Sequence, residues 1–109
     1  MLLAELTDGA REDAELREKA LSFDEVKQLA AEAQPALRVL DFISPADHIK
    51  VIAEVKRASP LRGDMAEIAD PAALATLYES AGASIISVLT EGRRFKGSLD
   101  DLRSVRAAV

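Results

Sequence analysis

The stretch Val51-Ile-Ala-Glu-Val-Lys-Arg-Ala-Ser-Pro60 decides the fold, because it is a short apolar strand with charges near its end. Alternate side chains of a strand point to the same face, so Glu54 and Lys56 are expected to lie side by side. Residues 57–69 then form a long connection before the helix signal Asp70-Pro71. Charges and a long loop at the C-terminal end of a strand are typical of phosphate or carboxylate sites in parallel α/β proteins.

After residue 50 the sequence alternates between strand and helix signals. Asp70-Pro71 predicts a helix start, with an N-cap acceptor followed by proline, and Gly82 predicts the end of that helix. Residues 84–90 are β-branched and nearly all apolar, which is typical of a strand buried on both faces. Ser98-Leu-Asp-Asp101 has the spacing of a capping box and opens a last helix. Two such units in succession predict parallel strands joined by a right-handed crossover.

The first part of the sequence predicts helices without strands. Apolar residues recur at helical spacing over residues 2–20. Ser22-Phe-Asp-Glu25 has the form of a capping box and opens a second helix through about Ala33. Residues 36–50 are expected to form a helical turn and a surface connection. The predicted organisation is a helical extension, 1–50, followed by two βα units, 51–109.

A sheet of two parallel strands leaves surface that the predicted elements cannot cover. Parallel sheets are normally buried on both faces, because their crossover helices pack against them. Two strands and two helices cannot cover both faces and both edges. We therefore expect the front part of a larger barrel or sheet, or a chain that self-associates.

The composition indicates a globular protein, with 49% apolar and 30% charged residues in a chain of 109. The net charge of -5 argues against nucleic-acid binding, since a phosphate backbone is bound by an excess of basic residues. The chain has no cysteine and one histidine, His48, so neither a metal site nor a cofactor is expected, and a cytoplasmic location is the simplest. His48 precedes the N-terminal end of the strand. In such folds this end contributes to stability and not to catalysis, so no catalytic role is expected for His48. Neither a signal peptide nor a membrane segment is indicated, so a soluble protein without a membrane partner is expected.

Each candidate site residue also has a purely structural interpretation. Glu54 and Lys56 fit a half-exposed strand with a solvated charged face as well as a binding site. Phe95, in the segment after the second strand, fits a hydrophobic plug as well as a wall against an aromatic substrate. The loop after the first strand fits either a solvated connection or an anion-binding loop. Its residues in question are Arg57, Ser59, Arg62 and Gly63.

Several motifs together resemble the N-terminal part of indole-3-glycerol phosphate synthase. The resemblance is carried by the opening stretch and by Ile86-Ser-Val-Leu-Thr-Glu-Gly-Arg-Arg-Phe-Lys-Gly-Ser-Leu-Asp-Asp-Leu102. Further matches are Asp70-Pro-Ala-Ala-Leu74, Tyr78-Glu-Ser-Ala-Gly82 and, more weakly, Ser22-Phe-Asp-Glu-Val-Lys27. The resemblance implies a TIM (β/α)8 barrel, of which this chain would supply the helical extension and the first two βα units. It also implies a lyase of tryptophan biosynthesis, which closes and decarboxylates the phosphosugar 1-(2-carboxyphenylamino)-1-deoxyribulose 5-phosphate.

The resemblance also implies roles for individual residues. Lys56 matches the family lysine that contacts the substrate and assists the chemistry, and Glu54 matches the glutamate that orients this lysine and reaches substrate hydroxyls. Ser59 matches a substrate-binding serine, and Phe95 matches an aromatic wall of the pocket. Leu61 stands where the family usually has a second serine, so one hydroxyl is missing.

The resemblance further implies that the chain carries only part of the site. The family's principal acid lysine lies on a third strand, beyond Val109, and the base and main phosphate loop come later still. The isolated chain is therefore expected to be inactive, and to self-associate or to pair with the missing part of the barrel. Two alternatives stay open: another phosphosugar barrel of the tryptophan or histidine pathways, and a non-enzymatic assembly module in which Glu54 and Lys56 form only a salt bridge.

Overall fold

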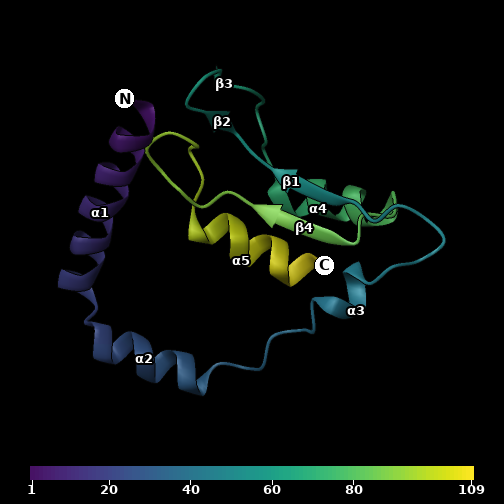
Figure 1. Cartoon of the computed structure of the whole chain (residues 1–109), viewed down its shortest axis with the longest axis horizontal. Helices are drawn as coiled ribbons and strands as arrows, with labels where there is room; N and C mark the ends of the chain where they lie inside the picture. Colours follow the sequence, from purple (N-terminus) through teal and green to yellow (C-terminus); the bar gives the residue numbers. More distant parts are fainter. The chain divides into compact units, whose positions relative to one another are not determined.

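The computed structural model describes all 109 residues and divides into two compact units, Met1–Leu37 and Arg38–Val109 (Figure 1). The first unit consists of the helices α1 (Leu2–Ala20) and α2 (Phe23–Glu32), as the sequence predicts. Neither helix contains a buried residue. No helix of the chain combines the length and the apolar character that crossing a membrane requires.

The predicted capping box is present at the start of α2. The Ser22 hydroxyl accepts the Glu25 N–H at 3.3 Å, and the Glu25 carboxylate accepts the Ser22 N–H at 2.8 Å. These bonds satisfy two backbone donors that have no partner within the helix. Hydrogen bonds from the Ser22 side chain and backbone lower the pKa of Glu25, because they favour its charged form.

The second unit is an α/β structure around a two-stranded parallel sheet of β1 (Ile52–Val55) and β4 (Ile85–Val88). Helix α4 (Pro71–Ser80) connects the two strands, and α5 (Leu99–Ala108) follows β4. The predicted order of strands and helices and the parallel pairing are thus confirmed. The short helix α3 (Leu40–Ile43) provides the helical turn expected before β1.

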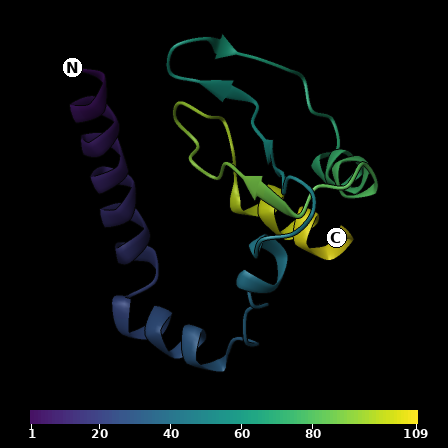
Figure 2. The ribbon, with the colours of Figure 1, turned by 45° about the vertical axis from the view of Figure 1, so that its right-hand side comes forward.

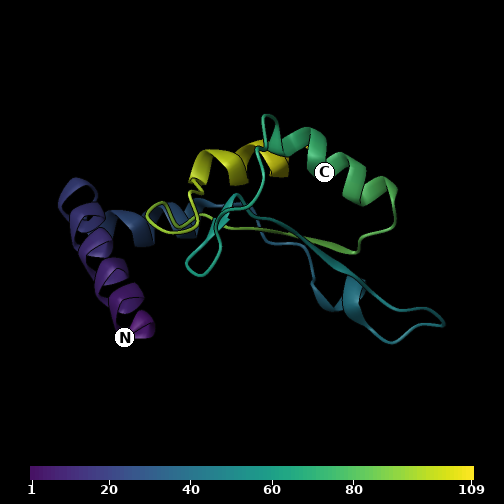
Figure 3. The ribbon, with the colours of Figure 1, turned by 90° about the horizontal axis from the view of Figure 1, so that it is seen from above.

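The core lies on one face of the sheet, where α4 and α5 pack against the strands and against each other (Figure 3). Its buried apolar residues are Val55, Ala58, Ala75 and Val105. The other face is open, and Ile52 on it is 61% exposed. The prediction that residues 84–90 form a strand buried on both faces is therefore wrong for this chain, because both helices cover the same face and every β4 residue stays partly exposed.

The connection after β1 contains a small antiparallel hairpin, which the sequence analysis did not predict. Its strands are β2 (Ala58–Ser59) and β3 (Gly63–Asp64). Gly63 has a φ of 64°, in the left-handed region that glycine adopts without a steric penalty. Strands of this length carry no alternating pattern of apolar residues, so the periodicity of the sequence could not reveal them.

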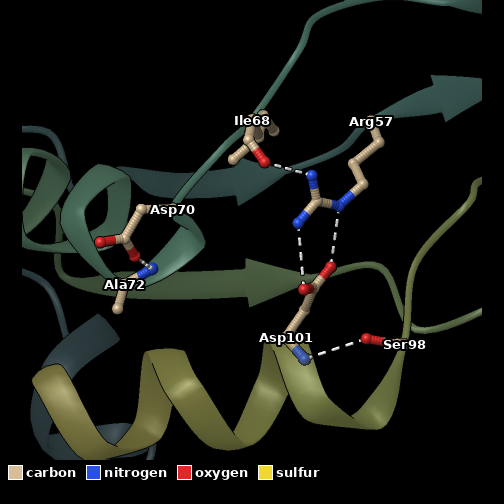
Figure 4. Close-up of polar contacts among 6 residues, drawn as sticks. All are labelled: Arg57, Ile68, Asp70, Ala72, Ser98 and Asp101. Atoms are coloured by element: carbon tan, nitrogen blue, oxygen red, sulfur yellow. Dashed lines mark hydrogen bonds and ion pairs between the residues drawn. The ribbon is translucent and has the colours of Figure 1, made fainter.

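Arg57 ties the end of β1 to the first turn of α5 (Figure 4). Its Nε and Nη2 atoms donate to the two Asp101 oxygens at 2.9 and 3.0 Å, and its Nη1 atom donates to the Ile68 carbonyl. The side chains of this pair are only 26% and 16% exposed. The hydrogen bonds that Arg57 donates to the Asp101 carboxylate raise the pKa of Arg57, because they favour its charged form. Arg57 therefore has a structural role in this unit, and the anion-binding interpretation of the loop after the first strand stays a prediction.

Each of the two large helices of this unit begins at a side-chain cap (Figure 4). Asp70 accepts the N–H groups of Ala72 and Ala73 at 3.0 and 3.1 Å, as predicted for the start of α4. The Ser98 hydroxyl accepts the Asp101 N–H at 3.0 Å at the start of α5. The predicted capping box at this helix is only half formed, because both Asp101 oxygens bind Arg57 instead of reaching back to Ser98.

We expect acid to weaken the start of α2. The pKa of Glu25 is lowered in the folded chain, so its stabilising contribution is complete above the ordinary value of about 4.5 and is lost as the pH falls through the lower folded value. A pH titration of the Ser22 and Glu25 amide NMR signals would measure this loss. Glu25→Gln is expected to remove the transition, and a midpoint above the ordinary value would contradict the prediction.

We expect Asp101→Asn to lower the free energy of unfolding by about 2 kcal/mol, because it leaves a mostly buried guanidinium without its charged partner. Asp100→Asn is the matched control, since the Asp100 side chain is 90% exposed in its ion pair with Arg103. Its expected cost is about 0.5 kcal/mol or less. Urea denaturation of the two variants would measure the difference, and equal losses would contradict the structural role of the Arg57–Asp101 pair.

Candidate functional site

Glu54 and Lys56 lie at the C-terminal end of β1. Alternation along the strand places them on the open face, opposite to the buried Val55. The Lys56 Nζ atom is 2.7 Å from Glu54 Oε1, and the two side chains are 31% and 40% exposed. The predicted proximity of the two residues is therefore confirmed, and both are partly exposed on the side of the sheet opposite to α4 and α5.

Ser87 is a third member of this group, which the sequence analysis did not identify. The register of the sheet pairs Glu54 on β1 with Ser87 on β4. The Ser87 hydroxyl donates to Glu54 Oε2 at 3.3 Å. Glu54 is thus held by an ammonium from its own strand and by a hydroxyl from the neighbouring strand. Only the strand register could have revealed this contact, because Ser87 is otherwise an ordinary polar residue in an apolar segment.

Ser59 lies in β2, beyond the Glu54–Lys56 pair. Its hydroxyl accepts the Arg62 N–H at 3.2 Å, and this bond stabilises the turn between β2 and β3. Leu61, which replaces the serine expected from the resemblance, is 86% exposed in this turn. The hydroxyl of Ser59 thus has a structural partner within its own hairpin, and its predicted role in substrate binding stays a prediction.

The loop after β4 carries the half-buried Phe95 and lies beside the β2–β3 hairpin (Figure 2). An ion pair between Lys96 and Asp64 joins this loop to the hairpin. An open hollow of about 480 Å³ adjoins this ion pair. Its lining residues are Arg57, Asp64, Met65, Ala66, Glu67, Ile68 and Lys96. Glu54, Lys56, Ser59 and Phe95 are not among the residues that line this hollow.

The open face offers one ammonium and one carboxylate, together with the Ser87 hydroxyl that donates to this carboxylate. A lysine ammonium can donate to a carbonyl or carboxylate oxygen of a ligand, and a glutamate can accept from ligand hydroxyls. A metal ion is disfavoured at this carboxylate, because it is already paired with a cation. The chain has no group of three or more histidine, aspartate and glutamate side chains that could bind a metal.

Comparisons with known proteins identify the family. The sequence profile of the family described as indole-3-glycerol phosphate synthase matches residues 3–109. The indole-3-glycerol phosphate synthase of Leifsonia xyli is 65% identical over 108 residues, which are 99% of this chain and 42% of the relative. The indole-3-glycerol phosphate synthase of Mycolicibacterium vanbaalenii is 58% identical over 99% of this chain and 39% of its own length. The indole-3-glycerol phosphate synthase 1 of Streptomyces coelicolor is 54% identical over 99% of this chain and 40% of its own length.

The chain thus spans about two fifths of the length of the curated relatives it matches. The match is nevertheless continuous along this chain, from the helices of the first unit through α5. Identities of 54% to 65% over so long a segment are far above the level at which family membership is in question. This chain belongs to the indole-3-glycerol phosphate synthase family.

Proposed function

We propose that this chain supplies part of the active site of an indole-3-glycerol phosphate synthase. The reaction closes the ring of 1-(2-carboxyphenylamino)-1-deoxyribulose 5-phosphate with loss of carbon dioxide and water, in tryptophan biosynthesis in the cytoplasm. The observation that carries this proposal is the Lys56–Glu54 pair at the C-terminal end of a parallel strand in a member of this family. In α/β barrels this end of the strands carries the active site. Family membership favours this reaction over that of another phosphosugar barrel.

In this proposal Lys56 and Glu54 are catalytic residues. The Lys56 ammonium contacts the substrate and stabilises negative charge that develops on an oxygen during ring closure. Glu54 orients Lys56, as their 2.7 Å ion pair indicates, and accepts hydrogen bonds from substrate hydroxyls. Ser59 binds substrate, and Phe95 provides a wall against its aromatic ring. The principal acid, the base and the main phosphate site of the reaction come from residues outside 1–109.

We propose further that residues 1–50 form a helical extension and that 51–109 are the first two βα units of a (β/α)8 barrel. In such a barrel the helices form an outer layer, while the inner faces of the strands meet one another. The packing of α4 and α5 on one face of the sheet supports this arrangement. The open face, with Ile52 and Glu54, then corresponds to the barrel interior.

The catalytic proposal is tested in a hybrid enzyme in which this chain replaces the matched segment of the Leifsonia xyli relative. We expect the hybrid to form indole-3-glycerol phosphate, and Lys56→Met to lower kcat/KM by about a hundredfold or more, because it removes the ammonium. Glu54→Gln is expected to cost about tenfold, since the amide still accepts hydrogen bonds but no longer pairs with the ammonium.

Lys50→Met is the matched control for the loss of a lysine. Lys50 precedes the same strand, at the end that contributes to stability and not to catalysis in such barrels. Its effect on kcat/KM is expected to stay within about twofold. An active hybrid in which Lys56→Met has no larger effect than this control would contradict the proposed role of Lys56.

We expect the chain of 109 residues by itself to associate, because the open face of its sheet exposes the apolar Ile52 and each strand has a free edge. Sedimentation velocity would measure the association. Ile52→Lys should shift the chain toward the monomer, because it adds a charge to the open face. Leu77→Lys is the control, since Leu77 is an exposed residue on α4, and the substitution should have little effect. A cooperatively folded monomer of the unmodified chain would contradict this prediction.

A further inference from the structure

One carboxylate organises the loop that follows β4. Glu91 Oε1 accepts the Arg93 N–H at 3.1 Å, and Oε2 accepts the N–H groups of Arg94 and Phe95 at 2.7 and 2.9 Å. Three consecutive backbone donors therefore converge on one side chain. Such bonds are charge-assisted, so a carboxylate binds these donors more strongly than a neutral acceptor does.

The far end of the same loop is fixed by Gly97. Its N–H donates to the Glu91 carbonyl at 2.9 Å, which closes the loop on itself. A Cβ atom at position 97 would lie 1.8 Å from the Leu89 carbonyl oxygen, so only glycine lets the chain return this closely to the end of β4. Lys96, just before it, has a φ of 55°, which a residue with a side chain adopts only when its surroundings impose it.

These contacts determine the backbone at Phe95, the aromatic residue of this loop. The N–H of Phe95 is itself bound by Glu91, and both side chains are half-buried. The direction in which a side chain leaves the backbone follows from the backbone geometry at its own residue. By binding the Phe95 N–H, Glu91 fixes the backbone from which the Phe95 ring extends.

We propose that Glu91 is a positioning residue that holds Phe95 in place through the backbone of its loop. This inference rests on the proposed role of Phe95 as a wall against the aromatic ring of the substrate. Glu91 itself does not contact the substrate in this proposal. Its carboxylate orders residues 93–95 before substrate binds. The entropy cost of ordering Phe95 therefore does not reduce the free energy of substrate binding.

The positioning role is tested first without any enzyme activity, by amide hydrogen exchange and aromatic NMR signals in the chain of 109 residues. Glu91→Gln keeps the shape but removes the charge, and it should lower the protection of the Phe95 amide by about tenfold. Glu91→Asp keeps a carboxylate and should retain most of the protection. Glu79→Gln is the control on the exposed side of α4 and should change nothing in the loop. Unchanged Phe95 protection in Glu91→Gln would overturn the positioning role.

The functional consequence is tested by a double-mutant cycle in the hybrid enzyme. Glu91→Gln is expected to raise KM by about tenfold with a smaller change in kcat, as loss of a substrate-binding wall should. If Glu91 acts through Phe95, Glu91→Gln should have no further effect once Phe95→Ala is present. Additive effects of the two substitutions would overturn the inference. An active hybrid in which Phe95→Ala leaves KM unchanged would instead overturn the role of Phe95 in the proposed function.

Discussion

The bidentate ion pair between Arg57 and Asp101 is the interaction on which the second unit depends. It joins the end of β1 to the first turn of α5, and the same guanidinium donates to the Ile68 carbonyl, two residues before the Asp70 cap of α4. One side chain thus links the loop after β1 to the first turn of α5 and to the segment just before α4. Because successive strand residues point to opposite faces, Arg57 anchors the chain on the covered side, while Lys56 is presented on the open side. Arg57, which has a structural role, and Lys56, a candidate catalytic residue, are thus neighbours in the sequence but lie on opposite faces of the sheet.

The one-sided packing of the sheet explains why a charged pair can lie on a parallel strand. Charges buried between two layers are costly unless they are paired and hydrogen-bonded. Here α4 and α5 cover only the face that carries Val55, and the face with Glu54 remains accessible. On that face Glu54 is satisfied by Lys56 and Ser87, so the group is ordered before any ligand arrives. An ordered pair of opposite charges is suited to an anionic substrate with hydroxyl groups, in agreement with the function proposed for this family member.

The two loops at the C-terminal ends of the strands are each stabilised by their own polar side chain. Ser59 closes the turn of the β2–β3 hairpin, and Glu91 gathers the backbone donors of the loop after β4. The Lys96–Asp64 ion pair then joins the loops to each other. Local bonds of this kind let long connections remain ordered without a large apolar core beneath them. The residues proposed to meet substrate are therefore placed by hydrogen bonds rather than by burial.

The sequence by itself determined the helices, the strands β1 and β4 and two of the helix caps, because helical periodicity, Asp70-Pro71 and the Ser22–Glu25 box act over a few neighbouring residues. It also determined the proximity of Glu54 and Lys56, since alternation along a strand requires it. The tertiary structure alone decided the partners that lie far apart in the chain. Asp101 is 44 residues from Arg57, and its carboxylate leaves the predicted capping box to bind that guanidinium. Ser87 reaches Glu54 only through the register of the sheet, and the helices leave one face open only because both pack on the other. Local patterns cannot specify such contacts, because each depends on how separate elements dock against one another.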